Sequence, residues 1–371
     1  MILAAARPTV FQQFVAGEDL GDVGSVAQRL NTCGVRCIVD HSVEELDAEH
    51  ERQKNLETKL ELLKTLSSEL GASCSFVPIK LTSLVAPYML ERLTEGLHAA
   101  TSCTDDVADG IETVAGAAGL SDAELAELNH SVDGLRELCS GAAHAGIPIL
   151  LDAEQTHRQP AIRLIARELA REFNTGSPLV YDTHQAYLRG AANRVAAELE
   201  HARRGGYTFA VKLVRGAYRV GEAQRDAGVL QPSKRHTDDE YDRCAQMLLD
   251  AATDESPVAA VLLATHNRAS VDTFTSRMLA NGIAEDHPRI HFAQILGMAD
   301  GLTLGLGLEG FNAHKLVPYG KLTDVLPWLL RRLDENHDAL GAAAYERPLL
   351  RAEWRRRAGA CFTSWIEWGR Y

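Results

Sequence analysis

Short apolar runs alternate with longer amphipathic segments along the chain, from about residue 35 to residue 340. Runs of this length that are rich in Val, Ile, Leu and aromatic residues predict buried β-strands. The predicted strands are VRCIVD (35–40), SFVPIKL (75–81), IPILLDAE (147–154), PLVYDT (178–183), FAVKLVRG (209–216), AAVLLATHN (259–267), IHFAQILG (290–297) and FNAHKLVP (311–318).

The segments between these strands have helical periodicity. One places leucines at positions 56, 60, 63, 66 and 70, and another, AIRLIARELAREF, follows Pro160 at a favourable first helical position. Near-continuous apolar strands joined by helices indicate a parallel sheet that is covered on both faces. Eight such units predict an α/β fold, a (β/α)8 barrel of the TIM type, with a doubly wound open sheet as the structural alternative.

The flanking segments suggest a simple domain organisation. Residues 1–30 form an N-terminal helical lead-in, residues 31–340 the barrel, and residues 341–371 a basic C-terminal helix. Residues 101–129 are acidic and rich in Ala and Gly, and they include a capping-box signature, SDAE, so we interpret them as an insertion ahead of the third strand.

The last predicted barrel helix contains WLLRRLDEN (328–336), whose two faces differ. One face is an apolar stripe of Leu326, Leu329, Leu330 and Leu333, and the other carries Trp328, Arg331, Arg332 and Glu335. Pairs of Arg and Glu three or four residues apart are common on solvated helices. The face is therefore either a solvated surface or part of a site for an anionic and flat ligand.

Composition narrows the classes of protein. The 371 residues are 46% apolar and have a net charge of −13, which argues against nucleic acid or an anionic membrane as the main partner. No apolar run approaches the about 18 residues that a membrane span needs, although peripheral membrane association stays open. The seven cysteines form no CxxC pair and indicate reduced thiols in a reducing compartment.

Polar residues occur repeatedly at the ends of the predicted strands. They are Asp40, Lys80, Asp152, Glu154, Gln185, Lys212, Arg215, Tyr218, Thr265, His266, Asn267 and Gln294. In a barrel these positions meet at the C-terminal face, where active sites lie. The cations Lys80, Lys212, Arg215, Arg331 and Arg332 outnumber the carboxylates there, which favours a phosphate or carboxylate ligand.

The sequence argues against a metal site and a Rossmann dinucleotide site. No carboxylates are paired as Mg²⁺ ligands, and His266 has no second histidine at metal-ligand spacing. His287 and His291 are separated by Pro288, and we interpret them as loop residues. No GxGxxG follows the first strand.

Eight motifs occur in an order that resembles the proline dehydrogenase family, most closely its eukaryotic, plant-like branch, with hydroxyproline dehydrogenases as close relatives. They are FVAGE (14–18), LLDAE (150–154), HQAYLRG (184–190), VKLVRGAY (211–218), ATHN (264–267), FAQILGM (292–298), VPYG (317–320) and LLRRLDEN (329–336). The resemblance implies a distorted (β/α)8 barrel that holds FAD at the strand C-termini under a last helix. It also implies oxidation of L-proline to Δ1-pyrroline-5-carboxylate with electrons passed to a quinone.

The resemblance assigns roles to individual residues. Arg331 and Arg332 would hold the proline carboxylate, Lys80 would add a third cation, and Asp152 and Glu335 would pair with these cations. Glu44 matches a gating glutamate that pairs with an arginine. Residues implied to line the substrate pocket are Tyr218, Ile295, Leu316 and Trp328. Residues implied to bind the cofactor are Gln185, Lys212, Arg215, Gly216, Ala217, Thr265, His266 and Asn267.

Two positions depart from the family pattern. Leu316 and Trp328 stand where proline-specific members have tyrosine, so we expect altered ring selectivity, with hydroxyproline oxidation as the alternative activity. A flavin barrel of the methylenetetrahydrofolate reductase type and a barrel that only binds an anion are further alternatives. The resemblance implies the matrix side of the mitochondrial inner membrane for a eukaryotic protein and the cytoplasm or membrane periphery for a bacterial one. The start, MILAAAR, carries no usable signal or transit peptide unless a leader was trimmed.

Overall fold

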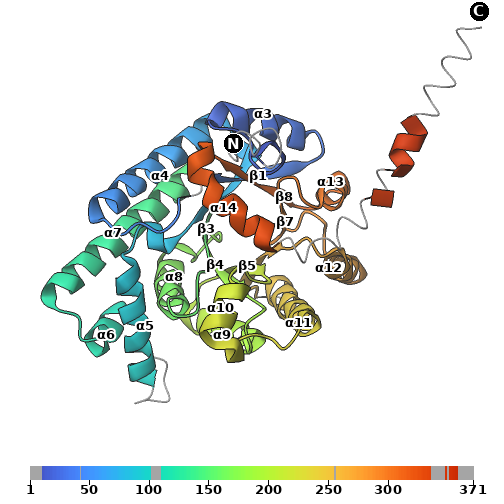
Figure 1. Ribbon diagram of the computed structural model, residues 1–371. Helices are drawn as coiled ribbons and strands as arrows, with labels where there is room; N and C mark the ends of the chain where they lie inside the picture. The colour runs from blue at the N-terminus through green and yellow to red at the C-terminus, as the bar shows by residue number, and fades with distance from the viewer. Residues whose placement is uncertain are drawn as a thin grey trace, which may run out of the picture.

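Eight parallel strands close into a barrel in the order in which they occur along the chain (Figure 1). The computed structural model describes residues 11–41, 43–101, 110–254, 256–335, 347–348 and 351–357, without the side chains of residues 100, 101 and 331–335. The strands are β1 Val35–His41, β2 Cys74–Ile79, β3 Ile149–Leu151, β4 Val180–Gln185, β5 Phe209–Val214, β6 Ala259–Ala264, β7 Ile290–Ile295 and β8 Ala313–Tyr319.

The pairing of β1 with β8 closes the barrel and excludes the open-sheet alternative. It runs without interruption from Val35 opposite Ala313 to His41 opposite Tyr319. All eight predicted strands are present, and β3 differs most from its predicted length, with three residues in place of eight. The backbone pairing of β3 with β4 ends at Leu151, which lies opposite Asp182. The polar residues that follow, from Asp152 on, therefore lie at the C-terminal end of the strand, at the barrel mouth.

Helices surround the barrel and cover its outer face. The short α2 Gln12–Phe14 and then α3 Leu20–Asn31 precede β1, and the crossover helices are α4 Glu49–Glu69, α5 Pro87–Thr101, α6 Ile111–Ala117, α7 Asp122–Ala145, α8 Gln159–Phe173, α9 Ala191–Gly205, α10 Arg219–Asp226, α11 Lys234–Thr253, α12 Arg268–Ala280 and α13 Asp300–Leu308. The described part of the chain also contains the 3-10 turns η2 Gly71–Ser73, η3 Leu81–Ser83 and η4 Ala227–Val229. In the described part of the chain no helix combines the length and apolarity of a membrane span.

The predicted capping box is present at the start of α7. The backbone N–H of Glu124 donates to the Ser121 hydroxyl at 3.4 Å, and the N–H of Ser121 donates to the Glu124 carboxylate at 2.8 Å. Residues 122–129 are therefore the first turns of a long barrel helix that buries Leu128 and Val132.

The barrel interior is filled near its N-terminal end by aromatic and histidine side chains. His291 Nδ1 lies 3.2 Å from His314 Nε2, and His314 Nδ1 lies 2.8 Å from the Ser75 hydroxyl. Phe76 contacts both imidazoles edge to face. Burial lowers the pKa of His291 to about 3, so the pair is neutral at physiological pH. His291 is thus a core residue of β7, and its interpretation as a loop residue was wrong.

The last barrel helix, α14 Leu322–Glu335, crosses the mouth of the barrel, as predicted (Figure 1). Its buried side chains are Val325, Trp328 and Leu329, which pack with Phe11 and Val15 of the N-terminal segment. The predicted apolar stripe was wrong in part, because Leu330 is 52% exposed and Trp328 is 4% exposed. The helix turns its Trp328 side inward because both the barrel mouth and residues 11–15 offer apolar surface on that side.

Candidate active site

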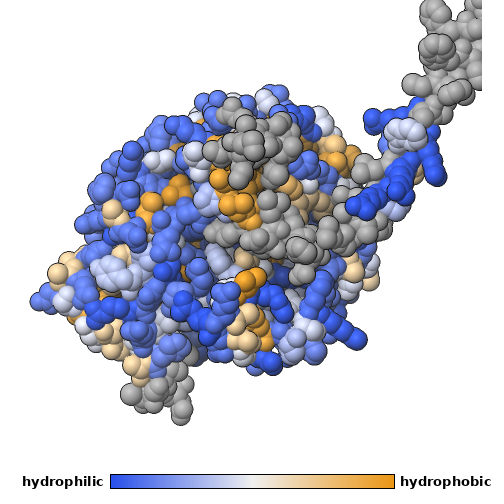
Figure 2. Space-filling model, in the orientation of Figure 1, coloured by the Kyte–Doolittle hydropathy of each residue, from blue (hydrophilic) through white to orange (hydrophobic). Residues whose placement is uncertain are grey.

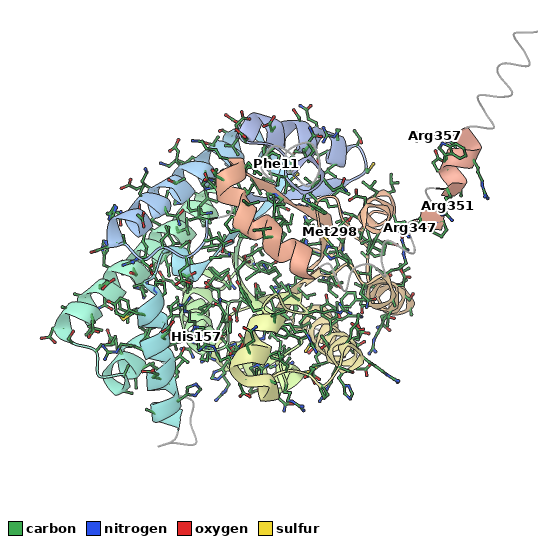
Figure 3. All side chains as sticks on the ribbon, in the orientation of Figure 1. Phe11, His157, Met298, Arg347, Arg351 and Arg357 are labelled. Carbon is green, nitrogen blue, oxygen red and sulfur yellow. The ribbon has the colours of Figure 1, made fainter. Side chains whose placement is uncertain are left out.

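A cavity of about 830 Å³ opens at the C-terminal ends of the strands beneath α14. Fourteen of the residues predicted for the site line it: Lys80, Asp152, Gln185, Lys212, Arg215, Gly216, Ala217, Tyr218, Thr265, His266, Asn267, Ile295, Leu316 and Trp328. They come from strands β2 to β8 and from α14. Met298, also on the cavity wall, lies beside α14 in Figure 3.

The charge of the cavity wall is strongly positive. Its cationic side chains are Lys59, Lys80, Lys212, Arg215, Arg219, Lys234 and Arg268, and its carboxylates are Asp40 and Asp152. Among its coloured residues, the face of the molecule seen in Figure 2 is mainly hydrophilic, with small apolar patches. Two further carboxylates, Glu44 and Asp238, pair with Lys80, Arg215 and Lys234. Among the described residues seven cations therefore meet four carboxylates, and this excess of positive charge favours an anionic ligand.

Two ion pairs cross the cavity wall. Lys80 Nζ donates to the Glu44 carboxylate, and Lys212 Nζ donates to the Asp152 carboxylate. Both lysines are 14% exposed, and their partners are about twice as exposed, at 29% for Glu44 and 28% for Asp152. A lysine is thus one partner of Glu44, and its expected pairing with an arginine stays a prediction. Asp152 pairs with Lys212 of β5.

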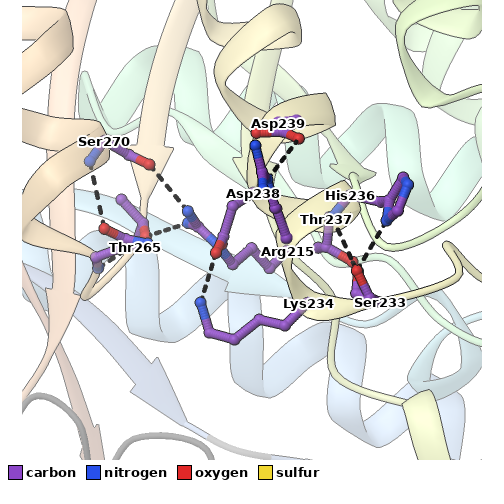
Figure 4. A network of polar contacts seen from close by, with 11 residues as sticks. Arg215, Ser233, Lys234, His236, Thr237, Asp238, Asp239, Thr265 and Ser270 are labelled. Atoms are coloured by element: carbon purple, nitrogen blue, oxygen red, sulfur yellow. Dashed lines mark hydrogen bonds and ion pairs between the residues drawn. The ribbon is translucent and has the colours of Figure 1, made fainter.

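Arg215 is held by a network that fixes the direction of its guanidinium (Figure 4). It donates to Asp238 at 2.6 Å, to the Thr265 hydroxyl at 2.6 Å and to the Ser270 hydroxyl at 2.9 Å. Burial alone would raise the pKa of Asp238, but hydrogen bonds from Lys234 and Arg215 outweigh it and lower that pKa. The network keeps Asp238 ionised and Arg215 directed along the cavity wall.

The turn after β5 brings backbone close to an aromatic ring. Gly216 has φ +138°, and a Cβ built on it would lie 1.5 Å from the Tyr187 ring. Only glycine fits this backbone conformation and this space. Ala217 and Tyr218 follow on the cavity wall, before α10 begins at Arg219.

The three residues after β6 each have a defined structural contact. The Thr265 hydroxyl accepts a hydrogen bond from Arg215, and the Asn267 side chain caps α12 by accepting from the N–H of Ser270 at 3.3 Å. His266 Nε2 accepts from the N–H of Ile295 at 3.1 Å. A ring nitrogen that accepts from an amide carries no proton, so His266 is a neutral imidazole in this arrangement.

Gln185 and Glu154 connect the ends of β4 and β3. Gln185 donates to the backbone carbonyl of Glu154 at 3.0 Å. The Glu154 carboxylate, 3% exposed, accepts from the N–H of Thr82 at 3.1 Å and from its hydroxyl at 2.8 Å. Burial raises the pKa of Glu154 despite these hydrogen bonds. The side chain of Gln185 is thereby fixed where the cavity wall passes from β3 to β4.

The predicted substrate clamp belongs to the last turns of α14. Arg331, Arg332 and Glu335 lie in this helix, but their side chains are outside the described part of the structure. The helix that carries them also carries Trp328, which lines the cavity and packs with Leu316 and Ile295. Position 332 follows Trp328 by one helical turn.

Lys59 of α4 belongs to the cavity wall, although the strand-end pattern does not include it. Its side chain is 3% exposed, and Nζ donates to the backbone carbonyl of His41 at 2.8 Å. Burial lowers the pKa of Lys59 to about 8, against the opposing effect of Asp40. The sequence does contain a signal for Lys59, because it lies within the apolar stripe of that helix. A lysine on the buried face of a helix needs a polar partner, which indicates a structural or functional role.

The fold and the site define a protein of the (β/α)8 barrel class with a cavity rich in cations at its C-terminal mouth. In the described residues no three His, Cys, Asp or Glu side chains converge as metal ligands. The family model for proline dehydrogenase matches residues 23–344, so this chain belongs to the proline dehydrogenase family and is an oxidoreductase.

Curated relatives extend over nearly the whole chain. The chain is 32% identical to a hydroxyproline dehydrogenase of Bos taurus over 95% of this chain and 82% of that protein. It is 30% identical to a protein named proline dehydrogenase 2, mitochondrial, of Arabidopsis thaliana over 97% of this chain and 80% of that protein.

Solved structures share the fold at lower identity. Proline utilization A from Bdellovibrio bacteriovorus superposes with a TM-score of 0.72 and 21% identity over 90% of this chain and 34% of that chain. The same protein from Bradyrhizobium japonicum gives a TM-score of 0.64 at 20% identity, over 88% of this chain and 30% of that one. The present chain thus spans about a third of those proteins and has the same barrel.

Proposed function

We propose that this protein oxidises L-proline to Δ1-pyrroline-5-carboxylate with bound FAD and passes the electrons to a quinone. The observation that carries the proposal is the cavity at the barrel mouth, where cations outnumber carboxylates even when the paired Glu44 and Asp238 are counted. Both the carboxylate of proline and the phosphates of FAD are anionic, and both require such a wall. Membership of the proline dehydrogenase family supports the reaction class.

The described residues fit FAD. A cavity of about 830 Å³ is within the range of cofactor sites, and several of its cations lie on the β5 and β6 sides, where Arg215 is fixed by Asp238, Thr265 and Ser270. Gly216 supplies a backbone segment without a side chain at the same wall. We assign Gln185, Lys212, Arg215, Gly216, Ala217, Thr265, His266 and Asn267 to the cofactor. When bound, FAD supplies the acceptor for a hydride from carbon 5 of proline.

The chain's own residues contribute orientation and electrostatics. In the proposal Arg331 and Arg332 hold the substrate carboxylate by charge-assisted hydrogen bonds, and Glu335 orients them. Lys80, whose partner is Glu44, provides an ammonium as a third donor at the same mouth. Trp328, Leu316, Ile295 and Tyr218 exclude water from the substrate ring, which fixes the ring in a reactive position.

Lys212 stabilises the negative charge that develops during hydride transfer. Its side chain is 14% exposed and pairs with Asp152, so its ammonium is largely shielded from solvent. A preorganised cation in such a position acts more strongly than one in water.

The proposal also concerns which substrate ring the enzyme prefers, that of proline or that of trans-4-hydroxyproline. Leu316 packs against the interior of the barrel and also against the Trp328 cluster, so its methyl groups border the ring position. Leucine offers no hydrogen bond to a 4-hydroxyl group, which favours proline. The hydroxyproline dehydrogenases among the relatives support oxidation of trans-4-hydroxy-L-proline as the second candidate activity.

The relatives named mitochondrial support a mitochondrial location for this chain. For a eukaryotic protein we place it at the matrix side of the inner membrane, where a quinone is available. A peripheral association would let the protein reach a quinone pool without a spanning helix.

The visible absorption spectrum tests the proposal. We expect flavin bands in the purified protein that bleach on anaerobic addition of L-proline and stay unchanged with NADH. Bleaching by hydroxyproline with a higher kcat/KM than by proline would reverse the order of the two candidates. Bleaching by NADH would favour a reductase of the methylenetetrahydrofolate type. A protein that stays colourless after FAD is supplied would contradict the flavoenzyme.

A further inference from the structure

Lys315 of β8 is a buried cation that lies outside the cavity. Its side chain is 1% exposed, whereas lysines are almost never fully buried without partners. Side chains alternate along a strand, and the neighbouring His314 and Leu316 point into the barrel. Lys315 therefore points outward, between the sheet and α13, and it does not line the cavity that Leu316 lines.

Three contacts of the Lys315 ammonium lie in one loop. Nζ donates to the carbonyl of Ile295 at 3.1 Å and to the carbonyl of Met298 at 2.5 Å. It also pairs with Asp300 Oδ1 at 2.7 Å. The donors of one ammonium thus reach three acceptors within six consecutive residues, from the end of β7 to the start of α13.

This loop has a demanding backbone conformation. Gly297 has φ +75°, and Ala299, with φ +50°, is the only described residue other than glycine with a positive φ. An alanine in the left-handed region is strained and persists only where surrounding contacts enforce it. The contacts of Lys315 to residues 295, 298 and 300 surround Ala299 on both sides.

The same loop forms part of the cavity wall. Ile295, Met298 and Ala299 all line the cavity, and Ile295 packs in the cluster that contains Trp328. His266 accepts from the N–H of Ile295, which ties the loop to the residues after β6. A change in the loop backbone would therefore move the wall on which the substrate ring and the cofactor depend.

We propose that Lys315 is a positioning residue: it holds the β7–α13 loop, residues 295–300, in the strained conformation that shapes the substrate side of the cavity. It acts through Ile295 and Met298, because its ammonium faces the loop from outside the barrel. The consequence for substrate rests on the proposed function, whereas the consequence for the loop does not.

The test compares Lys315→Met, which keeps the length and apolar stem of the side chain but removes its charge, with Lys321→Met, an exposed lysine, as the matched control. Amide hydrogen exchange reports on the loop, with peptides of α4 as the internal reference. We expect exchange in residues 295–302 to rise about tenfold or more in Lys315→Met only, because local opening is the event that the three contacts oppose. We expect the KM for proline to rise about tenfold with a smaller change in kcat.

Each outcome decides the proposal. Wild-type exchange in residues 295–302 of Lys315→Met would overturn it, as would uniformly faster exchange that includes α4. If Lys315→Met does not fold, Asp300→Asn decides, because it weakens one of the three contacts at a half-exposed position. Faster exchange confined to the loop supports the proposal, and wild-type exchange overturns it. If wild-type flavin ignores proline, the proposed function fails, while the exchange comparison still tests the role of Lys315.

Discussion

At the scale of the residue, Lys212 gives the sharpest test of the site. We expect Lys212→Met to lower kcat for proline about 10²- to 10³-fold, because it removes a preorganised cation from a partly dry wall. Steady-state kinetics with a dye acceptor measures the effect, and FAD content is determined for each variant. Lys64→Met, a lysine whose side chain is 76% exposed, is the control. A decrease of less than about threefold at full FAD content would contradict the role of Lys212.

Single residues also show how far the sequence predicts a site. Eleven of the twelve polar residues predicted at strand ends line the cavity, because parallel barrel strands all end at one face, and Glu154 is the exception. The ion pairs between these residues were less predictable. Asp152, which follows β3, pairs with Lys212 of β5, although β4 lies between these two strands in the sheet. Which carboxylate meets which cation depends on the stagger of the closed barrel, and the sequence does not contain this information locally.

At the scale of the element, the turn between β5 and α10 determines whether the cavity wall can form. Gly216→Ala would place a methyl group inside the Tyr187 ring and impose strain at φ +138°. We expect it to lower the free energy of unfolding by about 2–4 kcal/mol, in the range of strained and overpacked sites. Urea unfolding measures the change.

Gly221→Ala is the matched control for this turn. Gly221 lies five residues further on within α10, and a Cβ there would contact nothing within 4 Å. The same substitution should therefore be neutral or stabilise the protein by about 0.5–1 kcal/mol. Equal effects of the two substitutions would contradict the steric account of Gly216.

The helix α14 shows the limit of periodicity within one element. Its apolar residues predicted a helix correctly, but the face that is buried depends on neighbours. Residues 11–15 and the barrel mouth both pack on the Trp328 side, and Leu330 remains exposed. Hydrophobic spacing identifies a helix, whereas the partner selects the buried side.

At the scale of the whole molecule, the neutral histidines in the barrel predict sensitivity to acid. The pKa of His291 is lowered from 6.5 to about 3, so the unfolded chain binds a proton between these values that the folded chain does not. Stability therefore falls as pH drops below 6.5. Between pH 7 and pH 5 the free energy of unfolding of the wild type should fall about 2 kcal/mol more than that of His291→Gln. Urea unfolding at both pH values measures it.

The control for this prediction is His130→Gln, which changes an exposed histidine of α7. It should keep the pH dependence of the wild type. Parallel pH dependence of the wild type and His291→Gln would show that His291 does not contribute to acid lability.

The order of the whole fold was predictable because each strand and each crossover helix has its own local pattern. The closure could be inferred from the number of strands, but its register could not. The uninterrupted pairing of β1 with β8 depends on contacts between segments at opposite ends of the barrel.

That pairing has a consequence for biosynthesis. Val35 leaves the ribosome long before Ala313, its partner in the closed barrel, so an open sheet edge exists through most of translation. The cavity wall is incomplete until β8 and α14 have emerged, because Leu316 and Trp328 belong to it. If the proposed function holds, a cofactor can occupy its complete site only after β8 and α14 have emerged. Truncated or stalled chains would keep an unpaired strand edge that favours aggregation.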